Sequence, residues 1–327
     1  MENETNTSPN SKITVKAAAA LWLSEKHLFV KPSSYAKYAH TIQNYILPYL
    51  SDKYIDELNT LYLTEYLRFL LEKGRLDGKG GLSPKTVHDI YVIIRSILQT
   101  SELTWETTGK ISRIPNLWKR AVHISVLDTD SRKKLEKWLF VNADDKRCMG
   151  ILLCLYTGMR LGEICALKWE NIYPDKGFIR VNSTIQRIQN INAKSDEPRT
   201  QVICSPPKSL ASCRDIPLPQ FILELLQKDF PYPQGSCFFL TGKLDFLEPR
   251  SYQNCFKHYL SVNKISPINF HALRHTFATR CVVAGVDIKS LSEILGHASI
   301  QMTLNYYVHP SIDDKRRQIE LLSKDSF

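Results

Sequence analysis

The sequence has no cysteine pair of the C-x-x-C type and no apolar run long enough to cross a membrane. Its eight cysteines lie mostly inside apolar stretches, which argues against a zinc site and against a disulfide framework. A membrane helix needs about 20 consecutive apolar residues. The polar first residues, Met-Glu-Asn-Glu-Thr-Asn, also lack the apolar core of a signal peptide. These absences predict reduced, mostly buried thiols in a folded cytoplasmic protein.

Acidic residues are the scarcer charged class. The 327 residues include 43 Lys and Arg against 33 Asp and Glu, which gives a formal net charge of +10. A basic excess favours a polyanionic partner, and nucleic acid is the commonest for a soluble chain. The alternative at this point is a merely basic, solvated surface. Gly and Pro are few enough, and apolar residues frequent enough, to predict a folded chain with room for two domains.

Hydrophobic spacing divides the chain into four parts, and no internal repeat is visible. Residues 1–12 are polar and predicted to be disordered, and residues 101–125 lose their periodicity and resemble an interdomain linker. Between them, residues 13–100 have helical spacing throughout. We therefore predict an all-helical first domain. Its expected helices are Val15–Phe29, Ser33–Leu50 (ended or broken by Pro48), Leu61–Lys73 and Ser83–Leu98.

The second predicted domain, residues 126–327, alternates helices with a short β-rich middle. Three β-branched segments, Phe178–Gln186, Thr200–Cys204 and Cys213–Pro217, fit one small antiparallel sheet. The fold class is therefore mainly α with a small antiparallel sheet. The later predicted helices cover residues 218–230, 250–262, 271–284, 287–295, 299–308 and 311–323.

A glycine-rich turn between two predicted helices carries the first candidate site residue. In Gly158-Met-Arg160-Leu-Gly-Glu163, Arg160 lies at the edge of the turn and Glu163 follows one helical turn later. The functional interpretation is that Arg160 clamps a phosphate and Glu163 orients neighbouring cations. The plain alternative is a helix-capping ion pair, because the pattern is short.

A second group of polar residues lies on one predicted helix. His271 and Arg274 are three residues apart and therefore share a helical face. His271 and His275 have the spacing of a metal-binding pair. Neither a carboxylate nor a third histidine is placed to complete such a site, so we expect no metal. For His275 we expect the role of a satisfied core histidine.

The strongest signal is the segment Leu295-Gly-His297 followed by a short helix that ends in Tyr306-Tyr307-Val-His309. Tyrosines usually pack a helix against a core. That interpretation leaves the ordered series of arginines and histidines unexplained. Two guanidinium groups, two imidazoles and a phenol are what an enzyme needs to attack a phosphodiester without a metal.

The ordered set Arg160, His271-x-x-Arg274, Leu-Gly-His297 and Thr-Leu-x-x-Tyr307-x-His resembles the tyrosine recombinase (phage integrase) family over about residues 13–315. The resemblance implies a two-domain clamp on duplex DNA and a catalytic lysine on a β-hairpin. Lys208, in Ser-Pro-Pro-Lys208-Ser-Leu-Ala-Ser, matches that lysine. By itself it would be a solvated turn residue. The arm-binding domain of lambda-type integrases is not expected here.

The same resemblance implies Tyr307 as the nucleophile. In many members the tyrosine lies one residue closer to the motif histidine, so Tyr306 is the alternative. Arg160 and Arg274 would bind the scissile phosphate and His297 would donate a further hydrogen bond. His271 would act as base and Lys208 would protonate the leaving oxygen.

The implied reaction breaks and rejoins strands through a covalent 3′-phosphotyrosine, with no cofactor, metal or ATP. Its outcome would be integration, excision or inversion of DNA. The partners would be double-stranded DNA at specific sites and, in the synaptic complex, three further copies in a homotetramer formed from free monomers. The location would be the bacterial cytoplasm, at the nucleoid. Alternatives from other classes are a type IB topoisomerase and a catalytically silent DNA-binding protein.

In the helical domain, basic residues near helix starts or on polar faces are weaker candidates. Each would by default be a solvated side chain. The candidate phosphate contacts are Lys31, Lys37, Lys85 and Arg95.

Overall fold

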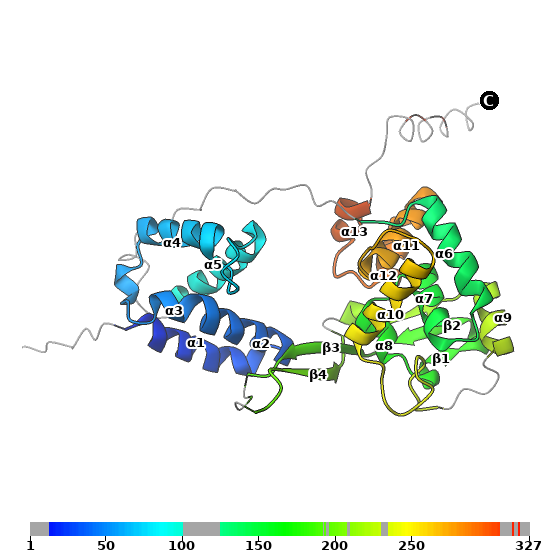
Figure 1. Cartoon of the computed structure of the whole chain (residues 1–327), viewed down its shortest axis with the longest axis horizontal. Helices are drawn as coiled ribbons and strands as arrows, with labels where there is room; N and C mark the ends of the chain where they lie inside the picture. The colour runs from blue at the N-terminus through cyan, green and yellow to red at the C-terminus, as the bar shows by residue number, and fades with distance from the viewer. Residues whose placement is uncertain are drawn as a thin grey trace, which may run out of the picture. The chain divides into compact units, whose positions relative to one another are not determined.

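The computed structural model describes residues 13–100, 125–191, 193, 196–207, 210–229 and 235–307, together with Arg316 and Glu320. Contacts divide the chain into a first unit, residues 1–122 with 188–201, and a second unit, residues 123–187 with 202–327 (Figure 1). Four sequence predictions lie outside the described residues. These are the disordered residues 1–12, most of the 101–125 linker, Lys208, and all of the 311–323 helix except two positions.

The first unit is helical, as its apolar spacing predicts. Its helices bury one face each around a shared core that includes Trp22, Ile46 and Ile94. The Trp22 indole donates a 3.0 Å hydrogen bond to Ser96 Oγ across this core. The helices are α1 (Val15–Phe29), α2 (Pro32–Thr41), α3 (Leu47–Leu50), α4 (Thr60–Lys73) and α5 (Pro84–Thr100).

The expected end or break at Pro48 takes another form. A π-helical segment, Ile42–Ile46, joins α2 to α3, and Pro48 lies within the first turn of α3. Proline has no N–H, so it cannot continue the regular hydrogen-bond ladder, but a helix start does not need that donor. The chain therefore changes its helical register before Pro48 and continues to Leu50, which is fully buried.

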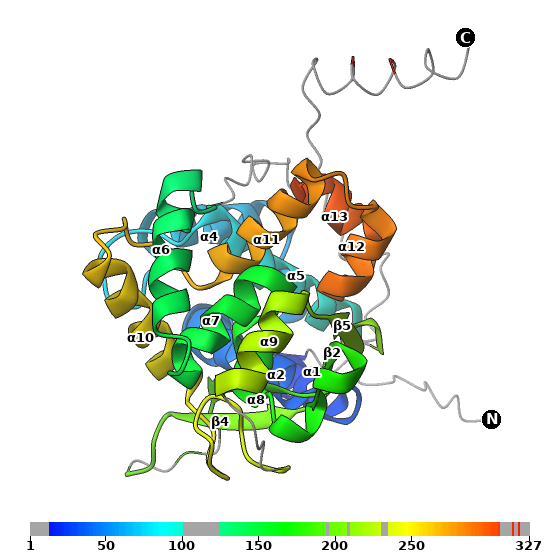
Figure 2. The ribbon, with the colours of Figure 1, turned by 90° about the vertical axis from the view of Figure 1, so that its right-hand side faces the viewer.

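In the second unit, helices surround the buried helix α7 (Lys146–Thr157). Residues on nearly every side of α7 are buried, and α6 and α11 pack against it (Figure 2). Asp128 caps α6 by accepting hydrogen bonds from two backbone amides. The other helices are α6 (Thr129–Val141), α8 (Leu161–Ala166), α9 (Gln220–Asp229), α10 (Pro249–Val262), α11 (His271–Val283), α12 (Ile288–Leu295) and α13 (Ile300–Tyr307).

The strands form two antiparallel sheets, where the sequence predicted one. Strands β1 (Ile172–Tyr173), β2 (Phe178–Val181) and β5 (Arg214–Pro217) make a three-stranded sheet. Strands β3 (Thr184–Gln189) and β4 (Thr200–Ser205) form a separate hairpin.

The prediction of a single strand over residues 178–186 is therefore wrong. The strand is interrupted at Asn182 and Ser183, and the Asn182 side-chain amide donates a hydrogen bond to the Asn171 side chain. The predicted class, mainly α with small antiparallel sheets, is confirmed. Within the described residues, no helix is both long and apolar enough to cross a membrane.

A small apolar cluster joins α11, α12 and α13. Ala278 of α11, Leu291 and Leu295 of α12, and Tyr307 of α13 are buried against one another. This cluster is distinct from the main core, which is built around α7. It fixes the last residue of α13 against α11, and so positions the phenol of Tyr307.

Candidate active site

Two glycine turns supply the framework of the site. Gly158 ends α7 and Gly296 ends α12, both with positive φ, 66° and 63°. A Cβ on Gly158 would lie 2.6 Å from a ring carbon of Phe277, so the position needs glycine for space as well as conformation. In each turn the glycine carbonyl oxygen accepts a hydrogen bond from an arginine. The Gly158 oxygen accepts from Arg274 at 2.9 Å, and the Gly296 oxygen accepts from Arg160 at 3.1 Å.

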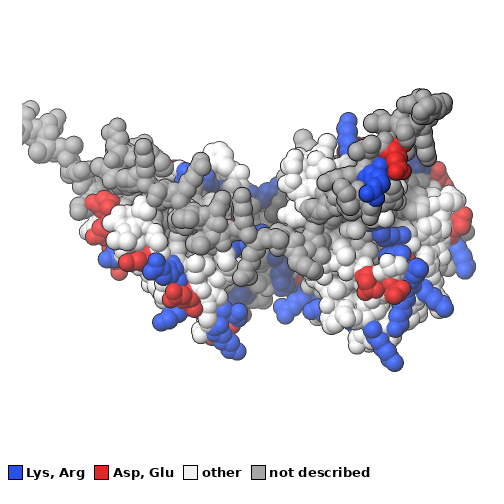
Figure 3. Space-filling view, turned by 90° about the horizontal axis from the view of Figure 1, so that it is seen from above, with Lys and Arg blue, Asp and Glu red and all other residues white. Residues whose placement is uncertain are grey.

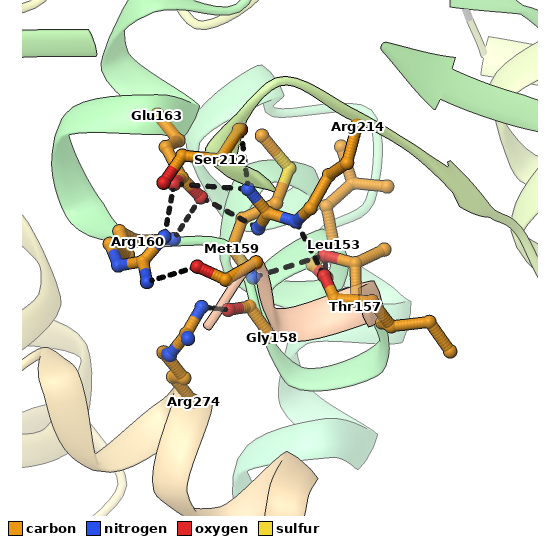
Figure 4. A network of polar contacts seen from close by, with 11 residues as sticks. Leu153, Thr157, Gly158, Met159, Arg160, Glu163, Ser212, Arg214 and Arg274 are labelled. Atoms are coloured by element: carbon orange, nitrogen blue, oxygen red, sulfur yellow. Dashed lines mark hydrogen bonds and ion pairs between the residues drawn. The ribbon is translucent and has the colours of Figure 1, made fainter. Parts of the chain in front are cut away.

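Glu163 is the anionic centre of a network of arginines (Figure 4). Its carboxylate accepts hydrogen bonds from Arg160 Nη1 at 2.7 Å and from Arg214 Nη2 at 2.9 Å. It also accepts from the backbone N–H of Arg160 and so caps α8. The pKa of Glu163 is held at about 2, because the Arg214 and Arg160 guanidinium groups outweigh the opposing effect of burial. The capping interpretation and the orienting interpretation are therefore compatible.

Arg214 is a site residue that our sequence reasoning did not single out. Besides Glu163, it donates to the carbonyl oxygens of Ser212 at 3.1 Å and of Ile294. Its side chain is only 6% exposed, so it links β5 to α8 and α12 from inside the protein. The available signal was the two-residue spacing of Arg214 and Ile216, which places the arginine on the apolar face of the predicted strand Cys213–Pro217.

Arg274 is the most deeply buried cation of the site, with 2% of the residue exposed. Its Nη1 is bonded to Gly158 O, but its buried Nη2 has no hydrogen-bond partner among the described residues. Burial, and then the charge of Arg160, lower its pKa to about 9. A buried guanidinium nitrogen without an acceptor is costly, which suggests that the site is built for an anion from outside the chain.

His297 follows the Gly296 turn and is held by α13. Its Nδ1 lies 2.8 Å from the hydroxyl of Thr303, which is completely buried. Burial, and then Arg274 and Arg160, lower the pKa of His297 to about 3, so the ring is neutral near pH 7. If the Thr303 hydroxyl donates to Nδ1, the proton of the neutral ring lies on Nε2, which can then donate to a ligand.

Tyr307 and Tyr306 differ sharply in their surroundings. Tyr307 is 8% exposed, its ring is parallel to that of His297, and its hydroxyl lies 2.6 Å from His275 Nδ1. Tyr306 is 38% exposed. Burial raises the pKa of Tyr307, and the positive charge of Arg274 acts in the opposite direction. The structure thus brings Tyr307 to the arginines and histidines and leaves Tyr306 largely open to solvent.

The two histidines of α11 both belong to this group of residues. His271 begins α11, and its ring centroid lies 4.6 Å from that of His275. Although part of His271 is open to solvent, desolvation and then the charges of His275 and Arg274 lower its pKa to about 4. His275, expected to be a satisfied core histidine, has a hydrogen-bond partner, but it is half-buried instead of lying in the core, and that partner is the Tyr307 hydroxyl.

The chemistry of the assembled site is that of a cationic pocket beside a phenol. The guanidinium groups of Arg160 and Arg214 are bonded to a single carboxylate, that of Glu163, and Arg274 feels the same charge without bonding to it. The neighbouring imidazoles of His271 and His297 are neutral at pH 7. Phosphate is the anion whose geometry suits such paired donors. In the described part of the chain, no three His, Cys, Asp or Glu side chains are grouped as metal ligands. Lys208, the sixth predicted catalytic residue, lies outside the described residues.

The first unit's candidates are spread over two helices. Lys85 and Arg95 are exposed on α5 and fall on one stripe with His88 and Val92. Lys37 of α2 instead forms a 2.8 Å ion pair with Asp89, and Lys31 precedes the first turn of α2. In Figure 3 the visible basic side chains of both units have acidic ones among them.

Comparison with known families gives two matches. The phage integrase family model matches residues 126–313, and the model of the phage integrase N-terminal SAM-like domain matches residues 14–71. Among curated proteins, a "tyrosine recombinase XerC-like" protein of Caldanaerobacter subterraneus subsp. tengcongensis is 26% identical over 92% of this chain and 81% of its own. The chain spans about half the length (54%) of the transposases from transposons Tn916 and Tn1545.

Solved structures show the same fold. The Tn1549 transposon integrase, in complex with circular intermediate DNA, aligns with a TM-score of 0.74 at 22% identity, over 95% of this chain and 100% of that one. A lambda integrase tetramer bound to a Holliday junction aligns with a TM-score of 0.61 at 18% identity, over 91% and 78%.

The fold, the site and the family matches define an enzyme that breaks and rejoins DNA strands, a site-specific recombinase. The chain belongs to the phage integrase family, that is, to the tyrosine recombinases.

Proposed function

We propose that this chain cleaves one strand of duplex DNA at a specific site with Tyr307, and rejoins it to a partner duplex. The observation that carries this assignment is the buried Nη2 of Arg274, for which the described residues provide no acceptor, in the same site as the Tyr307 phenol. A scissile phosphate bound there would satisfy Arg274 and lie against Arg160. The same phosphate would be within reach of His297, whose free nitrogen is the donor.

The chemistry follows from the charges. Attack by the Tyr307 oxygen on phosphorus gives a pentacoordinate transition state with an additional negative charge, which Arg160 and Arg274 stabilise in a partly dry site. Glu163 and Arg214 fix Arg160 in place through the network of Figure 4. The new O–P bond forms as the Tyr307 hydroxyl loses its proton to a histidine of the site and the bond from phosphorus to the 5′ oxygen breaks. The products are a 3′-phosphotyrosine and a 5′-hydroxyl, which takes its proton from Lys208.

The covalent link keeps the energy of the broken phosphodiester. A 5′-hydroxyl of a second duplex can therefore attack the phosphotyrosine and restore a phosphodiester without ATP. Two such exchanges, made by four copies of the chain around a Holliday junction, integrate, excise or invert DNA. The lambda integrase tetramer on such a junction supports this assembly, which free monomers would form on DNA.

In the proposed organisation, residues 13–100 grip the duplex opposite the catalytic domain, residues 126–327, and residues 101–125 connect the two. Lys31, Lys37, Lys85 and Arg95 are the proposed backbone contacts of the first domain. The match to the N-terminal SAM-like domain model supports its assignment as a separate module. The chromosome in the bacterial nucleoid is the proposed place of action.

Covalent capture of cleaved DNA tests this proposal and identifies the DNA target sequence in the same experiment. The protein is incubated with DNA that flanks its own gene, in EDTA, and quenched with SDS; the protein-linked ends are then sequenced. We expect 3′-linked ends at one sequence, and strand exchange between two plasmid copies of it. Obligatory magnesium for cleavage would overturn the metal-free mechanism. Relaxation of a plasmid that lacks the site, without any exchange, would instead indicate a type IB topoisomerase.

A further inference from the structure

One hydrogen-bond partner of the Tyr307 hydroxyl is a histidine outside the set expected to be catalytic. Its hydroxyl oxygen lies 2.6 Å from His275 Nδ1, with the two ring centroids 5.6 Å apart. His271, the base expected from the family resemblance, touches His275 edge-on and is more open to solvent. Within the described residues, the nitrogen best placed to receive the phenolic proton therefore belongs to His275.

The packing of three helices holds this pair together. Tyr307 is buried in the cluster with Ala278, Leu291 and Leu295, and Ala278 lies almost one turn after His275 on α11. The apolar cluster thus restrains the phenol ring while His275 meets its oxygen. Such a preformed contact between nucleophile and base is the arrangement that activates weak nucleophiles in other enzymes.

The charges around His275 favour its neutral form. The titratable and charged groups placed against it are His271 and Arg274 on its own helix and Tyr307 on α13. Arg160, at the start of α8, and His297, after α12, reach the same site. Burial, and then Arg274, lower the pKa of His275 below its ordinary value of 6.5. A neutral ring with its proton on Nε2 accepts from the Tyr307 hydroxyl at Nδ1.

We propose that His275 is the general base that takes the proton of Tyr307 during strand cleavage. The inference rests on the proposed function, in which Tyr307 is the nucleophile. The O–H bond of Tyr307 breaks, its proton moves to Nδ1 of His275, and its electron pair forms the bond to phosphorus. The bond from phosphorus to the 5′ oxygen breaks, and that oxygen is protonated by the general acid. In the rejoining step, His275 returns the proton to the departing phenolate.

Two substitutions separate proton transfer from simple orientation. In His275→Asn, the side-chain oxygen lies near the position of Nδ1 and can accept a hydrogen bond but not a proton. In His275→Phe, the ring is kept and both abilities are lost. His258→Asn, at an exposed position on α10, is the control for loss of a histidine elsewhere. The readout is single-turnover cleavage of a nicked suicide substrate at saturating DNA.

We expect both His275 variants to bind DNA normally and to cleave about 10²- to 10⁴-fold more slowly at pH 7, the usual contribution of a general base. The wild-type rate should fall in acid, below the ordinary histidine range, and become level at higher pH. In His275→Asn that level region should disappear, with the rate rising about tenfold per pH unit as hydroxide replaces the base.

The outcomes that overturn the proposal are distinct from a failure of the proposed function. A His275→Asn variant that cleaves at the wild-type rate would reduce His275 to an orienting role. A variant that cleaves faster would show that His275 restrains the nucleophile. Mapping the wild-type adduct comes first: a link to a residue other than Tyr307 would remove the proposed function itself, whatever His275 does.

Discussion

The two units hold their candidate residues in opposite ways. In the second unit, Arg274 is buried and bonded to a backbone carbonyl, and Arg214 is locked to a carboxylate. In the first unit, Lys85 and Arg95 are exposed on a helix surface. Bond breaking needs donors fixed to a fraction of an ångström, whereas phosphate-backbone binding needs only charge at the right distance. Substitutions in the two units should therefore affect different steps.

The largest effect on cleavage without an effect on DNA binding should come from the proposed nucleophile, Tyr307. Tyr307→Phe should bind DNA and form no covalent adduct on a nicked suicide substrate, since phenylalanine keeps the packing and loses the attacking oxygen. Neighbouring residues on a helix point about 100° apart. Tyr306→Phe, at the exposed position, should therefore retain cleavage. Adduct formation by both single variants would refute a tyrosine mechanism at this helix, and the reverse pattern would move the nucleophile to Tyr306.

Lys208 should show the next largest effect. If it protonates the leaving 5′ oxygen, Lys208→Ala should slow cleavage of ordinary DNA by about 10²- to 10⁴-fold. A substrate with sulfur at the 5′-bridging position should restore most of the rate, because a thiol of pKa near 8.5 leaves without an acid. The same sulfur substrate with Arg274→Ala is the control, and it should not be rescued. Equal rescue of both variants would remove Lys208 from the role of acid.

The two phosphate-binding arginines should act on rate more than on affinity. Arg160→Ala and Arg274→Ala should each slow cleavage by about 10²- to 10³-fold, the effect of losing one preorganised donor. DNA affinity should stay nearly unchanged, because many other phosphate contacts remain. Filter binding beside single-turnover cleavage measures both. An arginine variant that cleaves normally would exclude that residue from the site.

The sequence alone predicted those features of the fold and of the site that depend on local spacing. Arg160, His271, Arg274, His297 and Tyr307 were found because each lies in a short, ordered pattern, and the structure brings all five together. The helices of the first unit followed from apolar periodicity. Both results depend on local spacing, which a sequence displays directly.

What the sequence could not provide depends on packing between distant segments. Arg214 reaches Glu163 across 51 positions of chain, and nothing in its own segment specifies that partner. His275 was expected to be a satisfied core histidine, because its own helix is partly apolar and nothing in the local sequence shows which residue it meets. It meets Tyr307 only because α13 packs along that flank of α11. The separation of β2 from β3 likewise depends on which strand each one pairs with.

A smaller effect should come from Thr303, which bonds to His297 and is not one of the proposed phosphate-binding residues. Thr303→Val keeps the shape but removes the hydroxyl that holds Nδ1, so the ring loses its fixed tautomer and orientation. We expect cleavage to slow by about tenfold, the equivalent of roughly 1.4 kcal/mol, with unchanged DNA affinity. Thr303→Ser retains the hydroxyl and should cleave close to the wild-type rate. A slow serine variant would point to lost packing instead.

The smallest effects should come from the first unit, and they should appear in binding alone. Lys85→Ala and Arg95→Ala should each weaken DNA binding a few-fold and reduce the slope of log affinity against log salt by about 1. Lys37→Ala is the matched comparison, because Asp89 already offsets its charge at 2.8 Å, and it should leave the slope unchanged. Cleavage at saturating DNA should be normal in all three. A first-unit variant with normal binding but slow cleavage would break the division between a unit that holds DNA and a unit that cuts it.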